Sequence, residues 1–117
     1  MSDEVKKFNV FRREMNDRIL ASGNLAIKRF FALDKNAYKD GALTVETKEL
    51  LGLVASLVLR CNDCITYHLQ RCVEIGLSDD QLFEAFNVGL VVGGSIVIPH
   101  LRQAVARLDE LRADLVS

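Results

Sequence analysis

The sequence predicts an all-α protein, a compact bundle of five or six helices in a single domain over residues 1–117. Apolar residues recur every three or four positions along most of the chain, with charged residues between them, which is typical of amphipathic helices. No segment shows the sustained alternation of a half-buried strand. Proline, which interrupts helices, occurs once, at Pro99. The length of 117 residues fits one domain.

Periodicity and turn residues place the first three helices at about residues 3–21, 25–35 and 45–60. Ser22-Gly23-Asn24 separates the first two helices. Thr44 is a good N-cap for the third. That helix is apolar on nearly every side between Leu50 and Leu59, so we expect it in the centre of the core or in a subunit interface.

Capping signals define the remaining helices. Asn62-Asp63 are good capping residues inside an otherwise helical pattern, so they indicate either a kink or a fresh helix start. The fourth helix then runs to Glu74, with Gly76 as its stop. Ser78 and Gln81 form a capping-box pattern that opens a fifth helix, ending near residue 92. Gly93-Gly94-Ser95 breaks that helix, and a last one runs from Ile96 or Pro99 to about Leu115.

Charge and composition exclude several classes of partner. The net charge of −1 gives no electrostatic reason to expect DNA or RNA. The apolar runs are shorter than the roughly 20 residues that a transmembrane helix needs, so no membrane is expected. The charged N-terminus lacks the apolar core of a signal peptide. We therefore expect a cytoplasmic protein, where thiols are kept reduced and an odd number of cysteines argues against a disulfide framework.

The segment "RCNDCITYH" carries the chemistry, because it combines Cys61-x-x-Cys64 with His68. On a helix these three side chains share a face about 60° wide. Cys64 and His68 are four residues apart, so the imidazole can assist thiolate formation, and a helix start at Asn62 adds to this effect. Cys61 can then attack an oxidised Cys64 sulfur to close a disulfide.

Two other interpretations of the pattern stay open at this point. Buried cysteines are often inert, and the same spacing occurs in zinc sites. A structural zinc site commonly has four ligands in two pairs, whereas here the fourth would have to be Cys72, His100 or a carboxylate. By default, Cys72 is interpreted as a packed small hydrophobe and His100 as a structural or interface residue. The side chain of Tyr67 points about 100° away from that of His68 around the helix, so core or interface packing is its default interpretation.

Residues Lys48–Val105, from "KELLGL" to "RQAV", resemble the core of the carboxymuconolactone decarboxylase family, and within it the alkylhydroperoxidase-D-like branch. The branch motif is a glutamate, a C-x-x-C twelve residues later, and a histidine four beyond. Glu49, Cys61, Cys64 and His68 match it. A departure is Asp63, where the branch has a tyrosine; a carboxylate there disfavours a neighbouring thiolate.

The resemblance implies a function and an assembly. A redox core over about residues 44–112 would use Cys64 as the attacking thiol, Cys61 as the resolving thiol, and Glu49–His68 as a proton relay. The substrate would be a hydroperoxide or a partner disulfide, an external dithiol would be the reductant, and no cofactor or metal would be needed. Homo-oligomers, trimers or hexamers, are also implied. The alternatives are a carboxymuconolactone-type decarboxylase, which needs no cysteine pair, and a non-enzymatic oligomeric binding protein that keeps the motif.

Overall fold

A computed structural model describes residues 3–116, and within them it contains six α-helices, one short 3-10 helix and no strand. The all-α prediction is confirmed. The helices begin and end within a few residues of the positions expected from the capping signals: α1 (Glu4–Ala21), α2 (Leu25–Ala37), α3 (Val45–Val58), α4 (Asn62–Ile75), α5 (Asp79–Gly93), η1 (Ser95–Val97) and α6 (Ile98–Val116).

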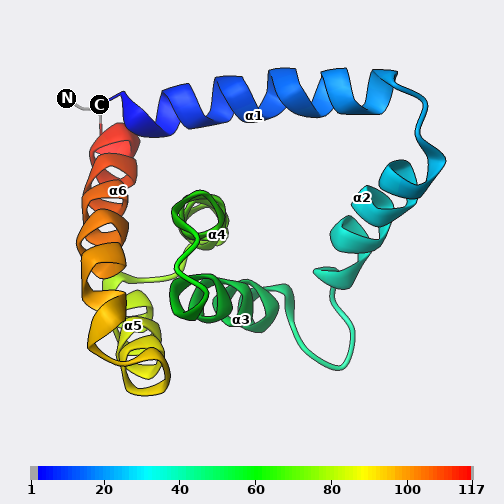
Figure 1. The fold of residues 1–117 in the computed structure, drawn as a ribbon. Coiled ribbons are helices and arrows are strands. Elements are labelled where there is room, and N and C mark those ends of the chain that lie inside the picture. Colours follow the sequence, from blue (N-terminus) through cyan, green and yellow to red (C-terminus); the bar gives the residue numbers. More distant parts are fainter. Residues whose placement is uncertain (1–2, 117) are drawn as a thin grey trace.

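The core lies among α3, α4, α5 and α6 (Figure 1). Helix α3 packs against both α4 and α5, and α4 packs against α6. The most buried side chains of the core include Leu53 and Leu57 on α3 and Leu69 on α4, which are fully buried. Phe86 on α5 and Leu108 on α6 are almost completely buried. Burial of such side chains contributes about 1.5–3 kcal/mol each. The apolar helix predicted over about residues 45–60 and observed as α3 is therefore central to the fold.

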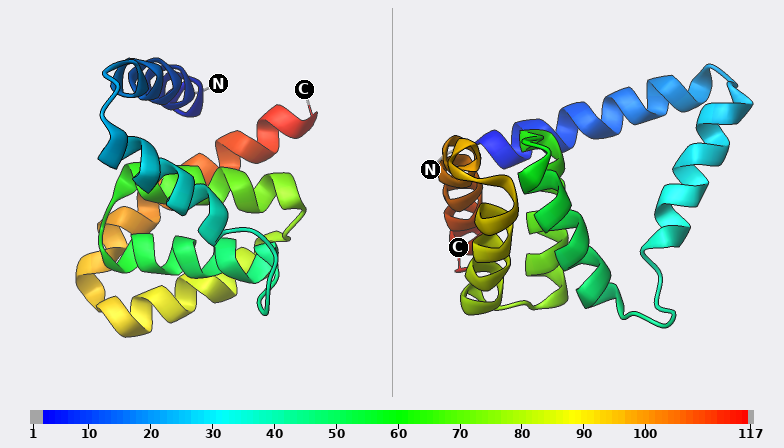
Figure 2. Two further views of the ribbon diagram at one scale, coloured as in Figure 1. Left: turned by 90° about the vertical axis from the view of Figure 1, so that its right-hand side faces the viewer. Right: turned by 60° about the horizontal axis from the view of Figure 1, so that its bottom comes forward.

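The N-terminal arm, residues 4–37, extends away from this core (Figures 1 and 2). Its first helix, α1, is attached near its beginning, where Val5 is buried and its N–H donates to Glu110 Oε2 on α6 at 2.6 Å. Helix α2 has no buried residue, and Phe30 is 66% exposed. The arm is thus held to the core at its ends, and the apolar face of α2 is uncovered in the single chain.

A second uncovered apolar surface lies on α3, α5 and the turn after α5. It consists of large exposed side chains: Leu51, Leu59, Val88, Val91, Val92 and Ile96. Gly94 forms the turn between α5 and η1, and its φ of 81° lies in the region that favours glycine. Among residues 3–116, no helix has both the length and the hydropathy needed to cross a membrane.

Candidate functional site

The site begins where the chain passes from α3 to α4. Arg60 has a φ of 59°, and its N–H donates to Leu57 O while the N–H of Cys61 donates to Ser56 O, both at 3.1 Å. These two bonds form the Schellman arrangement that ends many helices, here with arginine at the left-handed position. The reversal leaves Cys61 in an extended conformation, as the N-cap residue of α4.

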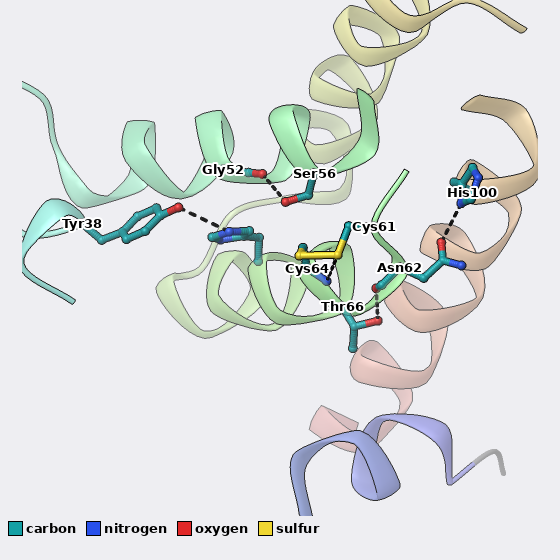
Figure 3. Close-up of a disulfide and its surroundings, with 9 residues drawn as sticks. Tyr38, Gly52, Ser56, Cys61, Asn62, Cys64, Thr66 and His100 are labelled. Carbon is teal, nitrogen blue, oxygen red and sulfur yellow. Dashed lines mark hydrogen bonds between the residues drawn. A yellow bond between two sulfur atoms is a disulfide. The ribbon is translucent and has the colours of Figure 1, made fainter. Parts of the chain in front are cut away.

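Cys61 and Cys64 are joined as a disulfide with a Cα–Cα distance of 5.3 Å (Figure 3). The backbone N–H of Cys64 donates to Cys61 Sγ at 3.3 Å, so the sulfur also caps the helix. Of the two alternatives expected at Asn62-Asp63, a kink or a fresh helix start, the structure has the helix start. The expectation that Cys61 shares a helical face with Cys64 and His68 is wrong, because Cys61 precedes the helix with φ −101° and ψ 99°.

Glu49 and His68 form a buried pair beside the two sulfurs. His68 Nδ1 lies 2.8 Å from Glu49 Oε1, and the two residues are 8% and 1% exposed. Arg71 Nε lies 3.7 Å from the other carboxylate oxygen. A buried carboxylate is costly unless it is paired, so these contacts explain why Glu49 sits on the inner face of α3. The structure therefore brings the four predicted motif residues together.

Gly52 makes room for the imidazole. A Cβ built on Gly52 would lie 2.7 Å from His68 Cε1 and 2.9 Å from each ring nitrogen. Real side chains essentially never come so close, so α3 can approach α4 at this point only with glycine. Sequence analysis did not single out Gly52; the available signal was a glycine inside a predicted helix, one turn after Glu49.

Two tyrosines contact the same imidazole. Tyr38, the residue that follows α2, places its hydroxyl 3.4 Å from His68 Nε2. Tyr67 stacks edge-on against the His68 ring with centroids 5.2 Å apart, and the Arg12 guanidinium lies over Tyr67. The interpretation of Tyr67 as packing directed away from His68 is corrected by this contact. Tyr38 was not predicted, because thirty residues and a turn separate it from His68.

A cavity of about 400 Å³ lies beside Cys64. Cys64 and His68 line its inner wall, and the opposite wall comes from α1, where Phe8, Phe11 and Met15 contribute apolar side chains. Cys64 is exposed, whereas Cys61 is half-buried and does not line this cavity. A small molecule in the cavity would therefore meet Cys64 rather than Cys61.

The remaining candidates have structural surroundings. Cys72 is a free, fully buried cysteine, and burial, followed by the charge of Glu49, raises its pKa to about 12. His100 Nδ1 lies 2.9 Å from Asn62 Oδ1 and so links α6 to the start of α4 (Figure 3). Asp63 lies exposed in the first turn of α4. Both the packing interpretation of Cys72 and the structural interpretation of His100 agree with these contacts.

The zinc alternative finds no ligand set in the part of the chain that the structure describes. Within residues 3–116, no three side chains among His, Cys, Asp and Glu are grouped so that they could hold a metal ion. The sulfurs of Cys61 and Cys64 are bonded to each other.

Comparison with known proteins gives consistent results. The family model described as the carboxymuconolactone decarboxylase family matches residues 25–107. A cox-locus protein of Paracoccus denitrificans is 33% identical over 82 residues, which are 70% of this chain and 74% of that protein. One crystal structure of a Thermotoga maritima protein has a TM-score of 0.90 and 62% identity, over 92% of this chain and 95% of that chain.

A further Thermotoga maritima structure, of a carboxymuconolactone decarboxylase family protein with a suggested part in an antioxidative response, is 61% identical with a TM-score of 0.88, over 92% of this chain and 91% of that one. A Legionella pneumophila member, 24% identical with a TM-score of 0.86 over 94% of this chain and 98% of that chain, shares the fold. The matched residues include the whole Glu49-to-His68 motif. This chain belongs to the carboxymuconolactone decarboxylase family.

Proposed function

We propose that the chain is a thiol-dependent redox protein of the alkylhydroperoxidase-D type, which reduces hydroperoxides or a partner disulfide through Cys61 and Cys64. The observation that carries this proposal is the cysteine pair at the start of α4, beside the buried Glu49–His68 pair and open to a cavity through Cys64. The suggested antioxidative part of the Thermotoga maritima relative supports the same class of chemistry.

Cys64 is the proposed attacking thiol because it is the exposed sulfur that shares a cavity with His68. His68 takes the thiol proton, with Glu49 orienting the ring and stabilising the resulting charge. The thiolate then attacks the terminal oxygen of a hydroperoxide, and the O–O bond breaks. Cys64 is oxidised to a sulfenic acid, and the alkoxide leaves as an alcohol after it takes a proton from His68.

Cys61 is the proposed resolving thiol. Its sulfur attacks the Cys64 sulfenic acid, which releases water and forms the disulfide. Its position as the N-cap of α4 favours its thiolate, because the N–H of Cys64 and the helix N-terminus both point toward the sulfur. An external dithiol then reduces the disulfide by attacking the exposed Cys64, and Cys61 leaves as the capped thiolate.

We also infer that the chain works as a homo-oligomer, a trimer or a hexamer, as the family resemblance implies. Helix α2 supports this inference, since an isolated helix of 13 residues is marginal in water and none of its residues is buried. The exposed apolar surface on α3 and α5 supports it independently. Light scattering on the eluted protein tests the proposal, and a monomer at micromolar concentration would refute it.

A cytoplasmic location fits the proposed cycle, because that compartment keeps external dithiols reduced. Alkylation of thiols in intact cells, followed by fractionation, tests this proposal. Recovery of Cys61 and Cys64 as a permanently oxidised pair would contradict it.

The decisive experiment follows the thiols of the reduced protein after one equivalent of peroxide. We expect a Cys61–Cys64 disulfide by mass spectrometry, with Cys72 unmodified. Cys64→Ser should abolish peroxide consumption, whereas the matched variant Cys72→Ala should retain it. If Cys64→Ser consumed peroxide at the wild-type rate, the assignment of the attacking thiol would be wrong.

A further inference from the structure

Tyr38 reaches the relay from the least buried helix of the chain. It follows α2, which has no buried residue, yet its own side chain is half-buried against α4 (Figure 3). Its hydroxyl lies 3.4 Å from Nε2 of His68, and the two ring centroids are 5.3 Å apart. This contact is a polar connection between the N-terminal arm and the buried pair.

The donors and acceptors around the imidazole determine which way this hydrogen bond runs. A carboxylate accepts hydrogen bonds, so Nδ1 of His68 carries the hydrogen that it donates to Glu49 over 2.8 Å. In the neutral ring Nε2 is then a bare acceptor, and the hydroxyl of Tyr38 donates to it. When Nε2 takes up a proton it becomes a donor, and the same hydroxyl can rotate and accept.

Resting on the proposed thiol chemistry, we propose that Tyr38 is a positioning residue that holds Nε2 of His68 in both protonation states of the ring. Because Nδ1 is committed to Glu49, Nε2 is the ring nitrogen left to take up a proton, on the lone pair that faces the hydroxyl of Tyr38. A hydroxyl that changes from donor to acceptor keeps the ring in place as the proton arrives. It also adds a charge-assisted bond to the imidazolium that accompanies the Cys64 thiolate. Phenylalanine could do neither.

The surroundings keep Tyr38 suited to this role at neutral pH. Burial raises the pKa of its hydroxyl, and the negative charges of Asp34 and Glu49, followed by Tyr67, act in the same direction. The hydroxyl therefore stays protonated and able to donate. The other charged groups that line the cavity beside Tyr38, of about 640 Å³, are Arg12 on α1, Lys35 on α2 and Arg71 on α4.

The first test measures alkylation of the reduced protein by iodoacetamide between pH 5 and pH 10, with mass spectrometry of the Cys64 peptide. In Tyr38→Phe the imidazolium loses one hydrogen bond to a charged group, so we expect alkylation about tenfold slower at neutral pH. The profile should also move to higher pH, while circular dichroism stays unchanged. A wild-type profile would overturn the proposal, as would an equal loss at every pH, which would indicate a purely structural contact.

The second test observes the hydrogen bond directly. The chain has two histidines, so ¹⁵N spectra of the ring nitrogens can separate His68 from His100. Tyr38→Phe should shift the Nε2 signal of His68 and leave His100, which bonds to Asn62, in place. Tyr67→Phe is the matched variant, because it alters a ring stacked on His68 and retains the Tyr38 bond. An unchanged Nε2 signal in Tyr38→Phe would overturn the proposal.

Neither test uses a peroxide, so the two proposals fail separately. A wild-type protein that forms no disulfide with peroxide would refute the proposed function. An altered Nε2 signal and a displaced alkylation profile in Tyr38→Phe would still support Tyr38 as the residue that positions His68.

Discussion

Replacing Gly52 with alanine tests whether the imidazole of His68 must occupy its observed place. The new methyl group would lie 2.7 Å from Cε1 of the ring, and ordinary contact begins at 3.4 Å. The ring must therefore retreat by at least about 0.7 Å. Because Glu49 lies on α3 as Gly52 does, a retreat of the ring from α3 also lengthens the 2.8 Å contact between Nδ1 and Glu49 Oε1 beyond the usual range of about 2.7–3.2 Å.

The loss of one hydrogen bond to a buried charge costs about 1.5–3 kcal/mol, which corresponds to a tenfold to hundredfold change in an equilibrium. We therefore expect reduced Gly52→Ala to alkylate at Cys64 about ten to a hundred times more slowly at neutral pH. The free energy of unfolding should fall as well, because overpacking costs about 1–3 kcal/mol and buried Glu49 loses a hydrogen bond, whereas alanine regains only about 1 kcal/mol of helix propensity over glycine.

Gly89→Ala is the matched control. It also lies within a helix, and its new Cβ would also come within 2.7 Å of a side-chain atom, here Cδ2 of Leu57. That contact is between α5 and α3, and Leu57 does not line the cavity of Cys64. Guanidinium unfolding should show both variants destabilised, Gly52→Ala by more because it also loses the Glu49–His68 hydrogen bond, whereas only Gly52→Ala should lose thiol reactivity. Wild-type alkylation in Gly52→Ala would refute the role assigned to the Glu49–His68 contact.

Three further changes give separate outcomes. The Cys72 thiol has a pKa of about 12 in the fold against an ordinary value of 9.0, so the unfolded chain releases its proton first as pH rises. Stability should therefore fall by up to about 1.4 kcal/mol per pH unit between these values, and guanidinium unfolding of Cys72→Ala should lack that slope. Glu110→Ala leaves the buried N–H of Val5 without its acceptor, which should cost about 1–3 kcal/mol and speed proteolysis within α1. Arg60→Gly should raise the unfolding midpoint, since a left-handed conformation costs an L-residue about 1 kcal/mol; a lower midpoint would contradict that strain.

Most of the fold could be predicted because the helix ends are marked by local chemistry. Ser78 accepts from the N–H of Gln81 and completes the expected capping box, and Thr44 caps α3 as predicted. Gly76 ends α4 in the left-handed conformation with a φ of 98°. These interactions join residues within one turn of each other, so sequence alone contains both partners.

The geometry of the cysteines shows where local reasoning fails. A kink or a helix start was expected at Asn62, and Cys61 was assigned to the helical face. The position of Cys61 is determined by the left-handed conformation of Arg60. Arginine rarely adopts this conformation, so the sequence does not predict it. The pairing with Cys64 is nevertheless formed, because an N-cap residue and N3 lie close together at any helix start.

The contacts of Tyr38 and Gly52 could not be predicted, since both depend on how separate helices pack. Glu49 illustrates the difference: its spacing from Cys61 identified it through a family motif, whereas no spacing rule connects Tyr38 to His68. A residue at the end of an exposed helix has few local signals. Its role becomes visible only when α2 is placed against α4.

The N-terminal arm therefore joins two properties that the sequence analysis treated separately. Its apolar residues are the ones that an oligomer would cover, and Phe30 and Phe31 on α2 precede the tyrosine that contacts His68 by two turns. Since α2 makes few contacts with its own core, the position of Tyr38 depends on whatever covers α2. If a second copy covers it, dissociation would release Tyr38 from Nε2 as well as expose the helix. Dilution of the wild-type protein should then shift the pH profile of Cys64 alkylation to higher pH, as Tyr38→Phe does. Dilution of Tyr38→Phe itself should cause no additional shift.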